Sequence, residues 1–151
     1  MIFAVLGAIC SYATIVLGGT VRGIPGAGLA CPDWPLCHGS VVPSLANPKI
    51  AVEYAHRLAA ALTSLCLFLT FLVCALRFRK ERWLVSWSSV ALGILATQVG
   101  LGAVTIASGL DWVIVTIHLA LGTATFATAL IIALLSVLQL RPLPVAEPPP
   151  D

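Results

Sequence analysis

The stretch "IAVEYAHRLAAALTSLCLFLTFLVCAL", residues 50–76, decides the fold of this protein. It is almost entirely apolar, and it is longer than the roughly 20 residues that a helix needs to cross the hydrocarbon core of a membrane. Three ionisable residues interrupt its first turns, namely Glu53, His56 and Arg57. Such residues are costly in lipid, and they usually face the interior of a helical bundle and serve a function there.

Three further stretches, about 2–21, 83–107 and 112–140, pass the same length test. The whole chain has 151 residues, of which 60% are hydrophobic and 9% charged, with a mean hydropathy of +1.05. This composition lies outside the range of soluble domains. The sequence therefore predicts an all-α integral membrane protein, a bundle of four transmembrane helices. The first stretch lacks a preceding basic residue and is too long for a signal peptide, so we expect a retained helix.

Charge predicts the orientation of the bundle. The connection "RFRKER", residues 77–82, has four basic residues and one acidic residue, and short basic loops stay cytoplasmic. Both termini are then cytoplasmic, and the long loop 22–49 faces outward. Residues 1–141 form the membrane domain, and the proline-rich tail 142–151 is expected to be disordered. The net charge of +2 is explained by the basic connection, so no nucleic-acid partner is expected.

The outward loop contains "GLACPDWPLCHG", residues 28–39, with two of the five cysteines. An outward loop lies in a compartment that permits disulfides. Five residues separate Cys31 from Cys37, and two of them are prolines that favour a short turn. We therefore predict a disulfide between these cysteines, and we expect the neighbouring His38 to be a solvated loop residue. The remaining cysteines lie within predicted spans and behave as small apolar residues.

Two histidines share a depth in the predicted membrane domain. His56 lies about six residues, roughly 9 Å, inside the outer end of the second span, and His118 lies about as deep in the fourth. These spans run in the same direction, so in an up-down bundle they are diagonal partners that face one central cavity. The two imidazoles could hold one metal between them, although a membrane histidine can also serve as an interhelical hydrogen-bonding residue.

The surrounding residues favour haem iron over zinc. Zinc takes three or four protein ligands, and this level offers only the two histidines and Glu53. Haem takes two axial imidazoles, an apolar slot and cationic partners for its propionates. Small residues that leave room for a macrocycle, and arginines near the outer surface, complete that set: Ala59, Ala60, Gly122, Arg22 and Arg57. Small residues also pack membrane helices in general, and arginines also snorkel to the interface.

Glu53 precedes His56 by three residues, so both project from about the same face of their helix. The carboxylate could support the histidine or simply neutralise Arg57, four residues further along. Over the rim of a porphyrin it could instead take a proton or stabilise positive charge that develops on a ring substituent.

Four segments together resemble the haem A synthase family: "GGTVRGIPGAGLACPDWPLCHG" (18–39), "EYAHRLAAAL" (53–62), "TQVGLGAVTI" (97–106) and "IHLALGTATFA" (117–127). They cover nearly the whole chain in the expected order. The resemblance implies a multi-pass oxidoreductase of the prokaryotic plasma membrane, surrounded by lipid. It would oxidise a methyl group of haem O to the formyl group of haem A for terminal oxidases, with the haem O-supplying synthase as a partner.

The resemblance also implies residue roles. His56 and His118 match the family's haem-ligand histidines, Glu53 matches its essential glutamate, and Cys31 and Cys37 match its outer cysteine pair, which is associated with a disulfide. Typical members look like two four-helix halves, one for substrate haem and one for a haem b cofactor. This chain resembles the substrate half. Either identical subunits assemble as a homo-oligomer and share both roles, or one haem site suffices.

Two other functions stay open. A membrane cytochrome b would use the same two histidines to hold a permanent haem for electron transfer, but this hypothesis gives Glu53 no role. A disulfide-exchange membrane protein would use the outward cysteine pair. That chemistry usually takes a tight C-x-x-C pair or a second cysteine pair in another loop.

Overall fold

Four long helices account for most of residues 2–139, the part of the chain that this computed structural model describes. They are α1 (Ile2–Gly23), α2 (Pro48–Arg77), α3 (Arg82–Ala107) and α4 (Trp112–Gln139). All four are long and apolar enough to cross a membrane, and the described residues form no strand. The predicted all-α, four-span architecture is confirmed, with small differences at the helix ends. The predicted disordered tail, 142–151, lies outside the described residues.

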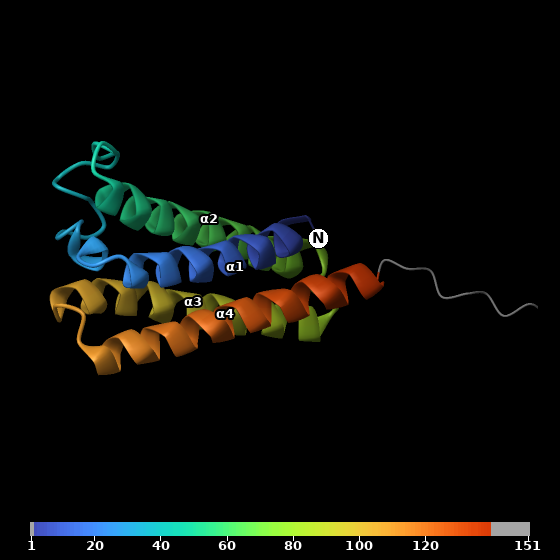
Figure 1. The fold of residues 1–151 in the computed structure, drawn as a ribbon. Coiled ribbons are helices and arrows are strands. Elements are labelled where there is room, and N and C mark those ends of the chain that lie inside the picture. The colour runs from blue at the N-terminus through green and yellow to red at the C-terminus, as the bar shows by residue number, and fades with distance from the viewer. Residues whose placement is uncertain (1, 140–151) are drawn as a thin grey trace, which may run out of the picture.

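The helices run up and down around a ring (Figure 1). Each one packs against its neighbours in the chain, and α1 and α4 close the ring, so α2 and α4 are diagonal to each other. The start of α1, the α2–α3 turn and the end of α4 lie at one end of the bundle. The long 24–47 loop and the α3–α4 turn lie at the other. The diagonal relation on which the histidine prediction depends is therefore present.

Local sequence signals fix where α2 and α4 begin. The Asn47 side chain accepts a hydrogen bond from the backbone N–H of Lys49 at 3.0 Å, and Pro48 occupies the first turn of α2. Both are favoured features of a helix N-terminus. Asp111 caps α4 in the same way, because its Oδ1 accepts from Val113 N at 3.0 Å and Ile114 N at 3.2 Å. These caps set the depth at which each histidine enters the bundle.

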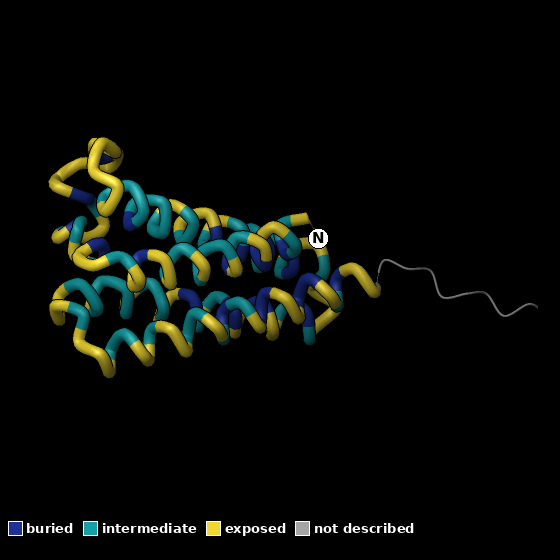
Figure 2. The backbone as a smooth tube through the Cα atoms, viewed as in Figure 1, coloured by how far each residue is buried: buried dark blue, intermediate teal, exposed yellow. Residues whose placement is uncertain are grey.

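The close-packed core occupies the half of the bundle that carries the α2–α3 turn (Figure 2). It consists largely of alanines, which allow helices to approach closely. Its buried members are Ala4, Ala8, Leu67, Ala91, Leu95, Ala129, Ile132 and Ala133. The half nearest the long loop is packed differently, and it contains the cavities described below.

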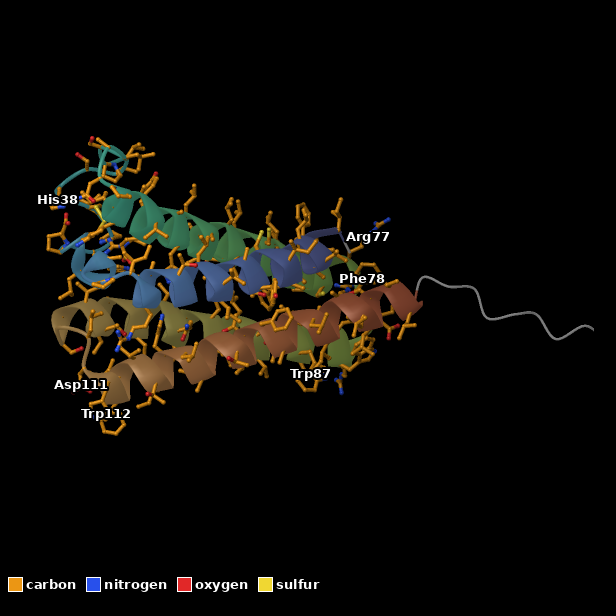
Figure 3. The ribbon with its side chains drawn as sticks, viewed as in Figure 1. His38, Arg77, Phe78, Trp87, Asp111 and Trp112 are labelled. Carbon is orange, nitrogen blue, oxygen red and sulfur yellow. A yellow bond between two sulfur atoms is a disulfide. The ribbon has the colours of Figure 1, made fainter. Side chains whose placement is uncertain are left out.

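The two ends of the bundle carry different labelled side chains in Figure 3. His38, Asp111 and Trp112 lie at the end with the long loop, and Arg77, Phe78 and Trp87 lie toward the other end. Trp112 is 74% exposed and Trp87 is 40% exposed. Exposed tryptophans near both ends of a bundle are typical of the two interfaces of a membrane.

Candidate functional site

A cavity of about 430 Å³ lies among all four helices in the half of the bundle nearest the long loop. A second cavity of about 180 Å³ adjoins it closer to that loop. Both are lined by His56, His118, Arg22, Arg57 and Trp34. The larger volume alone lies within the roughly 300–1,000 Å³ range of small-molecule and cofactor sites. The two predicted histidines therefore reach one ligand-sized space from diagonal helices.

His56 is held in place by α1. Its Nδ1 lies 3.0 Å from the backbone carbonyl oxygen of Thr14. A carbonyl only accepts hydrogen bonds, so Nδ1 carries the proton and donates it, and Nε2 keeps a lone pair. Gly18 faces the same ring, and a Cβ at that position would lie only 3.0 Å from His56 Cε1. The glycine leaves the space that the imidazole fills.

His118 is held less completely. Its Nε2 lies 3.5 Å from Nε2 of Gln98 on α3, at the limit of a hydrogen bond. Its Nδ1 is buried and has no hydrogen-bond partner among residues 2–139. A Cβ at Gly102 would approach His118 Cε1 at 3.5 Å, an ordinary contact. A buried polar atom without a partner is costly, so this nitrogen is a natural position for a ligand.

Glu53 is 5% exposed and lines the smaller cavity together with His56. Its Oε1 accepts a hydrogen bond from Nε of Arg57 at 2.9 Å, and this is the only ion pair within the described part of the chain. The i,i+4 pairing that the sequence suggested is therefore formed. The carboxylate nevertheless remains beside the histidine and in reach of the cavity.

Most N–H groups of Arg57 are bound to acceptors within the protein, which leaves few for a propionate. Besides Glu53, its guanidinium donates to three backbone carbonyls of the long loop: Asp33 at 2.8 Å, Leu36 at 2.6 Å and Cys31 at 2.8 Å. Four of its five N–H groups are thus engaged. Arg57 therefore joins the loop to α2, a role for which the sequence holds no signal. Arg22 lines both cavities, is exposed, and forms no ion pair with any residue between 2 and 139.

The long loop closes on itself above the smaller cavity. Cys31 and Cys37 are buried and joined by a disulfide in the structure, with their Cα atoms 4.7 Å apart. The Asp33 carboxylate accepts from the backbone N–H groups of His38 at 2.6 Å and Gly39 at 2.7 Å. These bonds, chiefly the one from Gly39, hold the pKa of Asp33 below its usual value. His38 is exposed, as expected, and its Nε2 lies 2.9 Å from the carbonyl oxygen of Ala30.

The small residues are arranged differently from the prediction. Ala60 and Gly122 line the larger cavity, but Ala59 does not. A Cβ at Gly122 would lie 3.0 Å from Gln98 Nε2, so this glycine makes room for the Gln98 amide. Gln98, in the segment "TQVGLG", was not singled out as a site residue. An amide within an apolar span was the signal that could have found it.

The donor set fits haem better than a bare ion. No three His, Cys, Asp or Glu side chains of residues 2–139 come together as a metal-binding group, whereas a bare zinc ion takes at least three such ligands. Two imidazoles on opposite walls, one with a buried unpartnered nitrogen, suit a group that brings its other ligands with it. Glycines next to the imidazoles and the Gln98 amide let these side chains take their places at the cavity.

Comparison with known proteins identifies a family. Residues 1–51 and 45–149 match the COX15-CtaA family model, described as cytochrome oxidase assembly protein. The haem A synthase of Bacillus pumilus is 29% identical over 126 residues, which cover 80% of this chain and 40% of that protein. The haem A synthase of Symbiobacterium thermophilum is 38% identical over 96 residues, 64% of this chain and 30% of that protein.

A third relative has a different name. The protohaem IX farnesyltransferase of Halobacterium salinarum is 36% identical over 138 residues, 90% of this chain and 30% of that protein. The chain thus spans 30–40% of the length of these relatives. No solved structure matches it significantly. The family model covers most of the chain, and the chain therefore belongs to the COX15-CtaA family of cytochrome oxidase assembly proteins.

Proposed function

We propose that this chain is a haem A synthase unit that binds haem O and oxidises one of its methyl groups to the formyl group of haem A, for use in terminal oxidases. The observation that carries the proposal is the pair of imidazoles, from His56 and His118, on one cavity of about 430 Å³ in a member of this family. The relatives named haem A synthase support the same reaction.

His56 and His118 are the residues that would hold the haem iron. The hydrogen bond from His56 Nδ1 to Thr14 fixes the tautomer that leaves Nε2 free to bind a metal. Arg22 is the proposed partner of a haem propionate, because its guanidinium lines both cavities without an ion-pair partner in the described chain. Arg57 lines the same space, but it has one N–H left to offer.

Glu53 is the proposed catalytic residue. Conversion of a methyl group and one water to a formyl group releases four electrons and four protons, so a base near the methyl and an external electron acceptor are both needed. The Oε1 atom of Glu53 is paired with Arg57, and we propose that the second oxygen takes a proton from the reacting group. The position of Glu53 beside His56 on the smaller cavity supports this role.

The proposal extends to assembly, partners and location. The family resemblance implies two four-helix units, and we propose that a second copy of the chain supplies the unit in which a haem b cofactor is held. The haem O-supplying synthase is the proposed partner, supported by the resemblance to a protein named protohaem IX farnesyltransferase. We place the bundle in the cell membrane with the disulfide loop outward, because the opposite end carries the basic turn.

The decisive experiment supplies haem O and an electron acceptor to the purified protein and looks for haem A by chromatography and mass spectrometry. Product from the wild type, and none from Glu53→Gln with haem still bound, is the expected result. Haem retention is measured by absorption in His56→Ala and His118→Ala, with His38→Ala as the matched control, since His38 lies in the exposed loop. Equal retention in all three variants would refute the ligand assignment.

A second candidate function gains from one observation. Because the Glu53–Arg57 pair anchors the loop, an electron-carrying cytochrome b no longer leaves Glu53 without a role. In that case the wild type retains haem but forms no haem A, and Glu53→Gln changes neither haem binding nor electron transfer. The haem O assay separates the two functions directly.

A further inference from the structure

Two buried polar atoms without partners lie on neighbouring side chains. They are Oε1 of Gln98 and Nδ1 of His118, and they are the only such side-chain atoms among residues 2–139. The same two side chains approach each other through their Nε2 atoms, 3.5 Å apart. An amide oxygen accepts and a protonated ring nitrogen donates. If the Gln98 oxygen faced the ring, it would accept from the nearer nitrogen, His118 Nε2, and Nδ1 would keep its lone pair for a ligand.

We propose that Gln98 is a positioning residue for His118. Its amide oxygen accepts a hydrogen bond from His118 Nε2, which leaves the lone pair of Nδ1 for the haem iron. A half-turn of the Gln98 amide group exchanges its own Oε1 and Nε2 atoms and brings Oε1 next to the His118 ring. The helices do not need to move. This inference rests on the proposed haem-binding function and adds a residue from α3 to it.

A glycine next to the Gln98 amide leaves room for it beside His118. A Cβ at Gly122 of α4 would lie 3.0 Å from Gln98 Nε2, and the same glycine lines the larger cavity. The chain therefore leaves space beside the amide at the level of the haem cavity. A larger residue at this position would push the amide away from His118.

The two histidines then differ in how they are held. His56 donates to the backbone carbonyl of Thr14. Every residue type has this carbonyl, so a substitution at Thr14 leaves the acceptor in place. His118 depends on a side chain that can be replaced. A ligand histidine that donates to an acceptor is more basic toward its metal, and loss of such a partner typically weakens metal affinity about 10–100-fold. The alternative is that Gln98 only joins α3 to α4. This role predicts no change in the affinity for the porphyrin or in its reduction potential.

The test titrates the purified protein with iron protoporphyrin IX and measures both affinity and reduction potential. In Gln98→Leu we expect a dissociation constant about 10-fold or more above the wild type and a more positive potential. In Gln98→Glu, which offers a stronger acceptor, we expect binding to be restored and the potential to fall below that of the wild type. The matched control is Thr97→Val, because Thr97 is exposed and its hydroxyl donates only to Gly93 of the same helix.

The outcomes separate this inference from the function on which it rests. If His118→Ala binds the porphyrin as well as the wild type, the proposed haem site itself is wrong. If His118→Ala loses binding while Gln98→Leu keeps the wild-type affinity and potential, only the role of Gln98 is refuted. If Gln98→Leu does not fold, Gly122→Ala displaces the same amide, and an unchanged potential in that variant refutes the role equally.

Discussion

Replacement of Arg57 by methionine tests how the long loop is held over the cavities. Methionine keeps an unbranched side chain but removes four hydrogen bonds of 2.6–2.9 Å, three of them to loop carbonyls. The Arg57 side chain is 14% exposed and that of Glu53 is 6% exposed, so the pair is largely screened from water. Removal of one partner from a buried ion pair costs about 3–5 kcal/mol.

This loss should lower the free energy of loop opening and leave the free energy of global unfolding unchanged. The close-packed core lies in the other half of the bundle, so the loop can open while the helices stay packed. A loss of about 3–5 kcal/mol corresponds to a rise of about 10²- to 4 × 10³-fold in the open population. Hydrogen exchange of loop peptides in detergent or nanodiscs measures this population, and we expect their protection to fall by that factor in Arg57→Met.

Two controls isolate the cause. Lys49→Met removes a nearby exposed cation. The Lys49 side chain makes no hydrogen bond to the residues that the structure describes, so we expect the loop peptides to exchange at the wild-type rate. Glu53→Gln keeps an acceptor for Arg57 and leaves its three loop bonds intact, so its effect should be much smaller than that of Arg57→Met. Unchanged loop exchange in Arg57→Met, with the variant folded, would show that the disulfide loop holds its position without Arg57.

Three further predictions concern the cavity and the loop. Gly18→Ala places a methyl 3.0 Å from the His56 ring, so we expect the affinity for the porphyrin to fall about 10-fold. The control is Gly23→Ala on the same helix, whose methyl meets nothing within 4 Å. It should match the wild type in the same titration. Arg22→Gln should weaken binding of a porphyrin with free propionates but not of its dimethyl ester, and equal losses for both would contradict the propionate assignment. The lowered pKa of Asp33 means that its carboxylate stabilises the loop fully above about pH 4 and loses this effect as the pH falls. Loop exchange should therefore rise in acid in the wild type but not in Asp33→Asn, and identical acid profiles would count against this role.

The four spans and the shared depth of the histidines could be predicted because each depends on one helix at a time. Hydropathy marks a span, and a rise of about 1.5 Å per residue converts sequence position into depth. His56 and His118 therefore reach one cavity as predicted. The supports of these side chains could not be predicted in this way, because the approach of Gln98 to His118 depends on how α3 and α4 are rotated against each other.

Arg57 shows a second limit of sequence reasoning. Three of its partners are backbone carbonyls in the loop, and a carbonyl is present at every position whatever the residue type. The sequence therefore contains no mark of these bonds. The residue type and its place near the start of α2 suggested an anionic ligand, whereas three of its acceptors in the structure are carbonyls of the loop.

The division of the bundle into a close-packed half and a half with cavities has a consequence for turnover. The alanine-rich core packs the helices together beyond the inner end of the cavity, with Leu95 at the boundary between the two, so we expect the scaffold to fold without a bound porphyrin. A catalyst that must release its product after each cycle benefits from this separation, since departure of the product leaves the scaffold intact. Substitutions in the two halves should accordingly differ in kind: those in the alanine-rich half reduce the yield of folded protein, and those around the cavity reduce its occupancy.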